Sequence, residues 1–371
     1  MNDFSATSAP VSSELFVSIS KKYAGGFKLD VSLTASPGIT ILFGSSGAGK
    51  TTLLDCIAGL ASPDSGKIAV SQKVFFDKNI NVPLRERGVG CVFQDLALFP
   101  HLTVEKNIQY GLAHLSSQER VRRCDTILES FGIANLRTRK PRQISGGEQH
   151  RVALARALVT NPRVLLLDEP LAALDAITKS KIIRDLRVWN HEQRIPILYV
   201  THSREEVFAL GERVLALEQG QILADGTPHE VMNAPLQETV AQLAGFENVF
   251  SSMVVHTNVE RGTMSCRLEG TEVELETPLV RAKSGSNLRI GIRAGDILLA
   301  TVLPQGLSAR NILPGKIMAL NQRDMIVVAR VNCGVEMEVH LTLAARDTLG
   351  LHTGQDVWLV IKTHSCHLMT G

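Results

Sequence analysis

Residues 44–51 read Gly44-Ser45-Ser46-Gly47-Ala48-Gly49-Lys50-Thr51, with Thr52 next, and this spacing is typical of a phosphate-binding loop. The loop follows the short apolar run 39–43, which predicts a strand, and opens the run 50–60, which predicts a helix. Glycines let successive backbone N–H groups converge on phosphate oxygens, and the helix N-terminus adds partial positive charge. Lys50 is expected to reach the β- and γ-phosphates of ATP, and the Thr51 hydroxyl to bind Mg²⁺.

A pair of carboxylates supplies the second half of this site. The apolar run Val164-Leu165-Leu166-Leu167 predicts a buried strand, and Asp168 and Glu169 stand at its end. Asp168 suits Mg²⁺, and Glu169 is placed one residue further on, where it can orient and polarise an attacking water. Taken alone, two acidic residues at the end of a strand more often serve only to solvate that end. Beside a phosphate-binding loop they indicate ATP hydrolysis.

Strand and helix patterns alternate over the first two-thirds of the chain. The expected strands lie at 15–20, 27–33, 39–43, 89–93, 164–167 and 196–200, and the expected helices at 50–60, 117–131, 147–160 and 176–192. This alternation implies an α/β fold with a mostly parallel sheet whose faces are covered. Beyond Pro235 helical patterns nearly stop, apart from a short one near 236–243. From Val249 onward short β-rich stretches separated by Gly and Pro indicate a small β-barrel or sandwich.

These patterns divide the chain into four segments. We expect a flexible tail at 1–13, an ATPase domain at 14–235, a linker at 236–248 and a β-barrel domain at 249–371. The length of 371 residues is too great for one ordinary core, and 44% hydrophobic with 20% charged residues is the balance of a globular protein.

The net charge and the hydropathy of the chain limit which partners it is expected to bind and where in the cell it is expected. A net charge of +2 gives no polyanion-binding surface, so nucleic acid is not expected as a partner. No apolar run approaches the ~20 residues that a spanning helix needs, and segment 1–13 lacks the apolar core of a signal peptide. We therefore expect the protein in the cytoplasm.

A third motif resembles that of a known family. Between the loop and the carboxylates lies Ile144-Ser145-Gly146-Gly147-Glu148-Gln149-His150-Arg151, which resembles the L-S-G-G-Q signature of ABC-transporter ATPases. The resemblance implies a P-loop NTPase with a RecA-like core and an ABC helical subdomain at about 95–149. Ile144 replaces the usual Leu, and Glu148 replaces the usual Gln.

Four further positions match this family in the expected order. Gln94 resembles the Q-loop glutamine, Asp175 the D-loop aspartate, His202 the switch histidine, and Tyr23 the ring that stacks on adenine. The resemblance implies that Gln94 and His202 act in catalysis with Glu169. It also places Gln94 beside the Mg²⁺ ion. Taken singly, Gln94 and His202 would more often be ordinary surface or satisfied polar residues.

One further departure lies in the D-loop. Ala172 replaces a serine that is common there, which removes one hydroxyl that would face a partner subunit.

The signature implies a homodimer through the ATPase domains. Ser145 and the N–H groups of Gly146, Gly147 and Glu148 stand at a helix start, where an anion binds well. In the family, each ATP lies between one phosphate-binding loop and the opposite subunit's signature. Asp175 would also contact ATP across this dimer. Closure of the dimer then permits hydrolysis.

The resemblance also implies integral-membrane permease subunits as partners. The segment after Gln94 is rich in apolar residues and is a candidate groove for a partner's helix. Its residues are Leu96, Leu98, Phe99, Pro100, Leu102 and Val104, with His101 among them. Roughly half of them are expected to belong to local core instead. The protein would then be peripheral, at the cytoplasmic face of the cell membrane.

The C-terminal segment resembles the β-domains of importers. The run Ser308-Ala309-Arg310-Asn311-Ile312-Leu313-Pro314-Gly315-Lys316-Ile317 resembles the S-A-R-N-x-L-x-G-x-V motif of molybdate-binding (Mop) domains. It implies an OB-like Mop/TOBE barrel with a core at about 306–370. In such domains Ser308, Ala309, Arg310 and Lys362 would cradle an oxyanion. The alternative is that Arg310 and Asn311 only brace the barrel turn.

The resemblance covers nearly all of the chain from residue 14 on and is closest to the ATPase subunits of molybdate importers. It implies import of molybdate, or tungstate, with a periplasmic or extracellular oxyanion-binding protein as an indirect partner. Importers of sulfate, ferric iron or sugar share related β-domains and stay open as alternatives. A soluble ABC ATPase of DNA repair or translation is disfavoured by the single cassette and the missing zinc modules and basic stripe. A molybdate-storage or sensing protein would not need a complete hydrolytic site.

Overall fold

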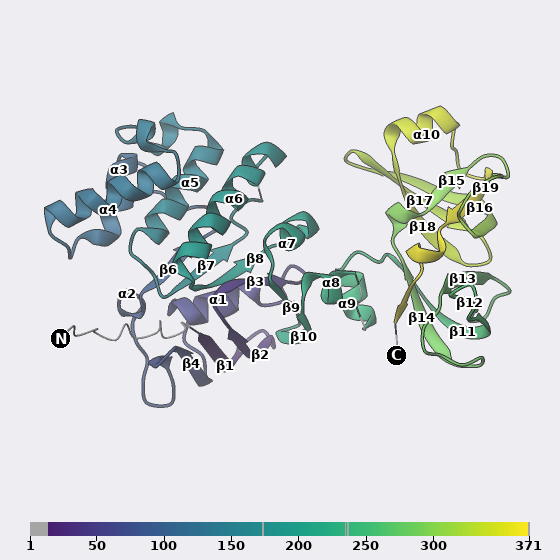
Figure 1. Cartoon of the computed structure of the whole chain (residues 1–371), viewed down its shortest axis with the longest axis horizontal. Helices are drawn as coiled ribbons and strands as arrows, with labels where there is room; N and C mark the ends of the chain where they lie inside the picture. The colour runs from purple at the N-terminus through teal and green to yellow at the C-terminus, as the bar shows by residue number, and fades with distance from the viewer. Residues whose placement is uncertain (1–13, 173, 234, 236, 370–371) are drawn as a thin grey trace, which may run out of the picture. The chain divides into compact units, whose positions relative to one another are not determined.

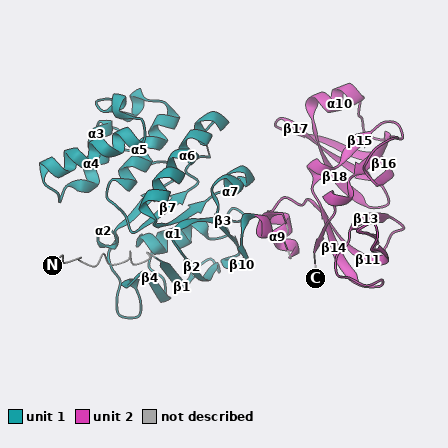
Figure 2. Cartoon of the chain, in the orientation of Figure 1, with its two compact units in different colours: residues 1–228 teal, residues 229–371 magenta. Residues whose placement is uncertain are grey.

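The computed structural model describes residues 14–172, 174–233, 235 and 237–369 (Figure 1). The expected tail at 1–13 lies outside these residues. The chain divides into two compact units, 1–228 and 229–371, coloured separately in Figure 2. This division falls before the expected linker at 236–248. That segment contains helix α9 (Glu238–Leu243), which buries Val240 and Ala241 and agrees with the short helical pattern expected near 236–243, and it ends at the first residue of strand β11 (Asn248–Asn258).

The first unit is built on a six-stranded sheet with the order β10-β9-β3-β8-β7-β6. All neighbouring strands are parallel except β10, which pairs antiparallel with β9. The mostly parallel sheet is therefore confirmed. Its strands are β3 (Gly38–Phe43), β6 (Val89–Val92), β7 (Val164–Asp168), β8 (Pro196–Val200), β9 (Arg213–Glu218) and β10 (Gln221–Gly226). Since parallel strands run the same way, the segments after β3, β6, β7 and β8 leave from one edge, where α/β sheets bind ligands.

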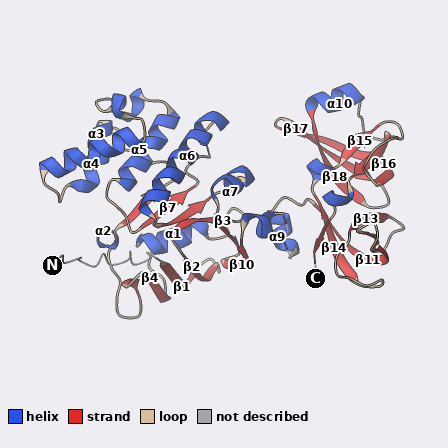
Figure 3. Cartoon of the chain, viewed as in Figure 1, coloured by secondary structure: helices blue, strands red, loops and turns tan. Residues whose placement is uncertain are grey.

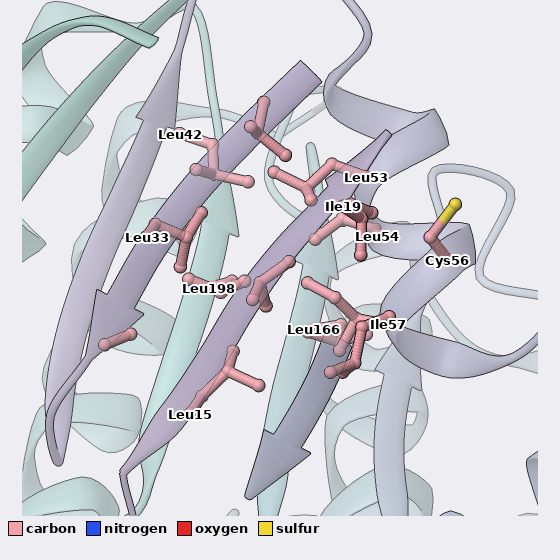
Figure 4. Close-up of a cluster of buried hydrophobic side chains, with 14 of the residues drawn as sticks. Leu15, Ile19, Leu33, Leu42, Leu53, Leu54, Cys56, Ile57, Leu166 and Leu198 are labelled. Atoms are coloured by element: carbon pink, nitrogen blue, oxygen red, sulfur yellow. The ribbon is translucent and has the colours of Figure 1, made fainter. Parts of the chain in front are cut away.

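A second, antiparallel sheet with the order β2-β1-β4-β5 packs against the first through a shared core. Its strands are β1 (Leu15–Lys22), β2 (Lys28–Ala35), β4 (Ser65–Val70) and β5 (Lys73–Phe76). Helix α1 (Lys50–Ala58) contributes Leu53 and Ile57 to this core, which also includes Leu15 of β1 and Leu166 of β7 (Figure 4). The helix that follows the phosphate-binding loop is thus fixed by apolar packing on its inner face.

The remaining helices of the first unit are seen in Figure 3. They are α2 (Leu84–Arg87), α3 (Val104–Gln109), α4 (Ser117–Ser130), α5 (Gly146–Leu158), α6 (Ala176–Gln193) and α7 (Arg204–Leu210). Helices α3, α4 and the start of α5 fall within the segment 95–149 that was expected to be helical. The starts of α5, α6 and α7 are fixed by side-chain caps, because Ser145, Asp175 and Ser203 each accept a hydrogen bond from a backbone N–H of the first turn.

The second unit consists mainly of two five-stranded antiparallel sheets, with the orders β13-β12-β11-β14-β20 and β15-β19-β16-β17-β18. Residues from both sheets form one hydrophobic core, so the small β-barrel predicted for this part of the chain is confirmed. Besides β11, the strands are β12 (Thr263–Leu268), β13 (Glu274–Pro278), β14 (Asn287–Ile292), β15 (Leu298–Ala300), β16 (Asn311–Arg323), β17 (Ile326–Asn332), β18 (Glu336–Thr342), β19 (Asp356–Ile361) and β20 (His367–Met369).

Two short helices of the second half were not expected from the sequence. Helix α8 (Pro228–Met232) buries Val231 and Met232, and α10 (Leu343–Leu349) is capped by the Thr342 hydroxyl, which accepts from Ala345 N–H. Both are too short to show a clear helical period. Among the described residues, no helix combines the length and the apolar character needed to cross a membrane.

Candidate active site

The phosphate-binding loop leaves the end of β3 in a conformation that requires glycine. A Cβ on Gly44 would lie 2.0 Å from the Leu217 carbonyl oxygen, so no side chain fits there. Gly49 is the N-cap of α1 and has a left-handed φ of 105°, which residues with a Cβ rarely adopt. The loop therefore turns directly into the N-terminus of α1, with backbone N–H groups free of side-chain obstruction.

Lys50 closes this loop from the first position of α1. Its side chain is nearly buried, and its Nζ donates to the carbonyl oxygens of Gly44, at 3.0 Å, and Ser45, at 2.8 Å. Burial lowers the pKa of the Lys50 ammonium, while the carboxylates of Glu169 and Asp168 oppose this effect. The hydrogen bonds of this nearly buried cation go to two neutral carbonyl oxygens, which a phosphate anion can replace as partner.

Thr51 in the first turn of α1 meets Asp168 at the end of β7. The Thr51 hydroxyl donates to Asp168 Oδ2 at 2.9 Å. Burial raises the pKa of Asp168, and the hydrogen bond from Thr51 works against that shift. Mg²⁺ prefers oxygen ligands, and a desolvated carboxylate beside a hydroxyl is a donor set that fits this ion.

Glu169 and His202 form a second pair at the same edge of the sheet. His202 Nδ1 lies 3.3 Å from Glu169 Oε2, and the His202 side chain is two-thirds exposed. Glu169 has a left-handed φ of 47°, and its N–H donates to the carbonyl oxygen of Val200 at the end of β8. A carboxylate that faces solvent beside an imidazole is suitable for holding a water molecule and accepting its proton.

These groups line one pocket of about 500 Å³. From the predicted site residues it collects Tyr23, Gly44, Ser46, Gly47, Gly49, Lys50, Thr51, Thr52, Gln94, Asp168, Glu169 and His202. Two predicted loop residues do not line it. The Ser45 hydroxyl instead donates to Glu218 Oε2 at 2.7 Å, and Ala48 is buried. Their side chains thus hold the loop, and only their backbone remains available to a ligand.

Phe27 lines the pocket as well and was missed from the sequence. It faces Tyr23 across the turn between β1 and β2, with ring centroids 6.2 Å apart, and Tyr23 N–H donates to the Phe27 carbonyl oxygen. Tyr23 is 44% exposed, so part of its ring remains open to a flat ligand. The signal that could have found Phe27 was a second aromatic residue at the far end of the same short turn.

The signature residues and Asp175 do not line this pocket. Ser145 caps α5 and forms a capping box with Glu148. Its N–H and its hydroxyl donate to Glu148 Oε2 at 2.7 and 2.9 Å, and Glu148 N–H points back to the hydroxyl oxygen. A Cβ on Gly147 would lie 2.5 Å from Thr178 Cγ2, so Gly147 permits close packing of α5 on α6. Gly146 and Gly147 thus lie at the N-terminus of α5, outside the pocket lined by Lys50.

Two of the predicted oxyanion residues, Arg310 and Lys362, lie at adjacent ends of paired strands in the second unit. Asn311 of β16 pairs with Ile361 of β19, which makes Arg310 and Lys362 neighbours just beyond the paired strands. Ser308, Arg310 and Lys362 are exposed, whereas Ala309 is buried. Asn311 is a bracing residue, because its side chain accepts from Glu276 N–H at 2.6 Å and donates to the Glu276 carbonyl oxygen at 2.9 Å.

Two family models match the chain. The ABC transporter model matches residues 29–172, an interval that holds the phosphate-binding loop, the signature and the two carboxylates. The TOBE domain model matches residues 307–368, which include Arg310 and Lys362.

Several curated proteins are similar over most of their length. The Molybdenum import ATP-binding protein ModC of Rhizobium meliloti is 38% identical over 91% of this chain and 96% of that protein. The protein of the same name from Methylococcus capsulatus is 39% identical over 91% and 95%. The Molybdate/tungstate import ATP-binding protein WtpC of Pyrococcus abyssi is 39% identical over 87% and 90%.

Solved structures of ABC cassettes are similar to part of the chain. The structure of cbiO1 from Clostridium perfringens, part of the ABC transporter complex cbiONQ, aligns with a TM-score of 0.55 and 29% identity. It covers 64% of this chain and 96% of that one. A bacterial ABC transporter cassette solved as a dimer aligns with a TM-score of 0.50 and 30% identity, over 58% and 98% of the two chains.

Proposed function

We propose a function from one premise: this chain belongs to the family of ABC transporter ATP-binding subunits that includes the molybdenum import ATP-binding proteins. It binds ATP and hydrolyses it to drive the import of molybdate. The assignment of individual residues to this reaction, the ion they use and the subunits they move is our proposal. The single observation that carries it is the pocket in which Lys50 meets Asp168 and Glu169, two parts of the chain that lie far apart in the sequence.

The reaction is transfer of the γ-phosphoryl group of ATP to water. Lys50 and the N–H groups of the loop hold the β- and γ-phosphates, and Tyr23 with Phe27 forms the aromatic wall for adenine. Glu169 orients the attacking water and takes its proton as the bond between the bridging oxygen and the γ-phosphorus breaks. His202 lies beside Glu169, with Nδ1 3.3 Å from Oε2, and it contacts the γ-phosphate when the site closes.

We propose Mg²⁺ as the ion of this site. Thr51 and Asp168 would hold it, with Gln94 joining them from the segment after β6. The chemistry that the ion supplies when bound is neutralisation of negative charge on the β- and γ-phosphates.

We propose that two copies of this chain form the complete site. Ser145, Gly146, Gly147, Glu148 and Asp175 do not line the pocket of their own subunit, so they are available to a second one. The N-terminus of α5 offers N–H groups to an anion, which suits the γ-phosphate bound by the opposite copy. The dimeric state of a similar solved cassette supports this arrangement.

The membrane partner is proposed to bind the segment after Gln94. Leu96 and Val104, two of its six apolar residues, are buried and belong to the core, whereas about half of the six were expected to do so. Phe99 is half-buried and packs on Tyr110, which is 61% exposed, with ring centroids 4.4 Å apart. This aromatic pair is the proposed seat of a permease helix, at the cytoplasmic face of the membrane.

Tungstate is a second candidate cargo, because one similar protein is named for both oxyanions. We further propose that Arg310 and Lys362 bind such an oxyanion in the second unit, since two cations on neighbouring strands suit a tetrahedral dianion.

An ATPase assay tests the assignment to a coupled subunit. The purified chain with Mg²⁺ should hydrolyse ATP slowly, and the rate should rise when the cognate permease subunits are added. A high rate that the permease leaves unchanged would contradict the proposed coupling.

A further inference from the structure

A nearly buried carboxylate on α7, the helix that follows the switch histidine His202, has no part in the reaction described so far. Glu206 of α7 is 3% exposed. It accepts hydrogen bonds from the Tyr199 hydroxyl at 2.9 Å and the Thr201 hydroxyl at 2.8 Å, and it pairs with Lys179 Nζ at 3.1 Å. Burial raises the pKa of Tyr199 well above its usual range, so this hydroxyl stays protonated and donates.

These contacts fix the backbone on both sides of His202. Thr201, held by Glu206, accepts a hydrogen bond from Ser203 N–H at 3.0 Å. Ser203 in turn caps α7 by accepting from Glu206 N–H at 3.4 Å. His202 stands between these two residues, with its ring exposed and directed at Glu169. The position of His202 therefore depends on the Glu206 carboxylate.

Lys179 connects the same carboxylate to the D-loop. It lies in the first turn of α6, where its N–H donates to the carbonyl oxygen of Asp175 at 2.9 Å. The Lys179 side chain is 22% exposed and that of Glu206 is 4% exposed, so water screens this pair only weakly. Two segments that the sequence presents as separate motifs are thus joined by one ion pair.

Fold stability alone does not account for this ion pair. A desolvated ion pair gains little over well-packed apolar side chains of similar volume, whereas loss of one partner leaves a costly unpaired charge. The arrangement does give a fixed geometry, since one carboxylate binds three donors from three elements: α6, β8 and the segment after β8.

We propose that Glu206 is a positioning residue for His202, and that the Lys179–Glu206 pair transmits movement of the D-loop to the switch histidine. This inference rests on the proposed function, in which Asp175 faces the opposite ATP and His202 its own. ATP binding at one site of the dimer would then set the position of the histidine at the other.

A double-mutant cycle on the full-length chain tests this proposal. Glu206→Gln should lower kcat roughly tenfold while the Kd for a fluorescent ATP analogue stays within about twofold. His202→Ala should lower kcat as well, and adding Glu206→Gln to it should change kcat by less than about twofold, because both changes remove the same contribution. Lys179→Met should behave as Glu206→Gln does. Glu205→Gln is the matched control, since Glu205 is exposed on the same helix.

Folding and function are separated in the same assays. The folded fraction at the assay temperature, from circular dichroism, corrects kcat for any destabilised variant. Tyr199→Phe, which removes one donor and no charge, provides a milder variant of the same network. Losses from Glu206→Gln and His202→Ala that multiply, or a corrected Glu206→Gln rate equal to wild type, would overturn the positioning role. Wild-type ATP turnover and its loss in Glu169→Gln report separately on the proposed function.

Discussion

At the scale of single residues, Glu169 combines an unusual backbone with the chemistry assigned to it. Its φ of 47° places it in the left-handed region, where residues with a Cβ are uncommon. The hydrogen bond from its N–H to the Val200 carbonyl oxygen holds this conformation. Such backbone strain concentrates at functional sites. The sequence predicted the carboxylate but not this turn, because the turn depends on the neighbouring strand β8.

Glu169→Gln is therefore expected to keep ATP binding and to lose turnover. The amide has nearly the shape of the carboxylate but cannot accept the proton of the attacking water. We expect kcat to fall roughly 10²-fold or more, within the range of general-base roles. Nucleotide titration and steady-state hydrolysis measure the two quantities, and near-normal turnover would remove Glu169 from this role.

Glu148 stands where the signature pattern usually has glutamine, and its carboxylate has a defined partner in the structure. Its carboxylate accepts both the N–H and the hydroxyl of Ser145, and these bonds lower the pKa of Glu148. A negative charge thus stands at the helix start where the opposite γ-phosphate is proposed to bind. Dimer closure would have to displace this carboxylate or tolerate its repulsion.

Glu148→Gln should therefore strengthen ATP-dependent dimerisation. We expect the dimer Kd to fall roughly three- to tenfold, equivalent to about 1 kcal/mol, with a smaller effect at high salt. Sedimentation in the non-hydrolysing Glu169→Gln background measures it. Glu119→Gln is the control, because Glu119 occupies the same third position of α4 after Ser116. Equal dimer Kd values for the two variants would assign Glu148 a capping role alone.

At the scale of elements, the helix that carries Lys50 is anchored at its far end by Arg87. This guanidinium is fully buried and donates to the carbonyl oxygens of Cys56 and Ile57, at the end of α1, and of Val82. Burial lowers the pKa of Arg87. A cation at the C-terminus of a helix is also favoured by the helix dipole.

Arg87→Met should therefore destabilise the first unit. It leaves several buried carbonyl groups without a donor, and we expect a loss of about 2–4 kcal/mol in unfolding free energy. Urea denaturation measures it, with Arg85→Met as the control, since the Arg85 side chain is 85% exposed on the same short helix. A similar stability for both variants would contradict the anchoring role.

The elements divide into those with a local signal and those set by distant partners. The phosphate-binding loop, the strand before Asp168 and the helix after Ser145 were predictable, because their glycines, apolar runs and caps act within a few residues. Helices α8 and α10, Phe27 in the pocket and the anchoring of α1 by Arg87 were not. Each depends on a residue far away in the sequence or on a segment too short for periodicity to be read.

At the scale of the whole molecule, the second unit is the part proposed to bind the oxyanion. The pairing of β16 with β19 makes Arg310 and Lys362 neighbours just beyond the paired strands. Asn311 of the same motif braces the barrel by binding Glu276, so the bracing alternative holds for this residue.

The full-length chain should therefore bind molybdate in calorimetry, and Arg310→Ala with Lys362→Ala together should weaken binding at least tenfold, as expected for loss of two charge-assisted contacts. Lys316→Ala is the control, because Lys316 is an exposed cation of β16 that faces Asp356. Unchanged affinity in the double variant would remove this pair from oxyanion binding.

Transport in reconstituted vesicles tests the central assignment most directly. Vesicles would contain this chain with its cognate permease subunits, with ATP on the side of this chain and the oxyanion-binding protein on the other. Uptake of labelled molybdate should require ATP, should exceed uptake of sulfate, and should be abolished when Glu169→Gln replaces the wild-type chain. Preferential uptake of sulfate, or molybdate uptake that Glu169→Gln leaves intact, would contradict a molybdate importer driven by this subunit.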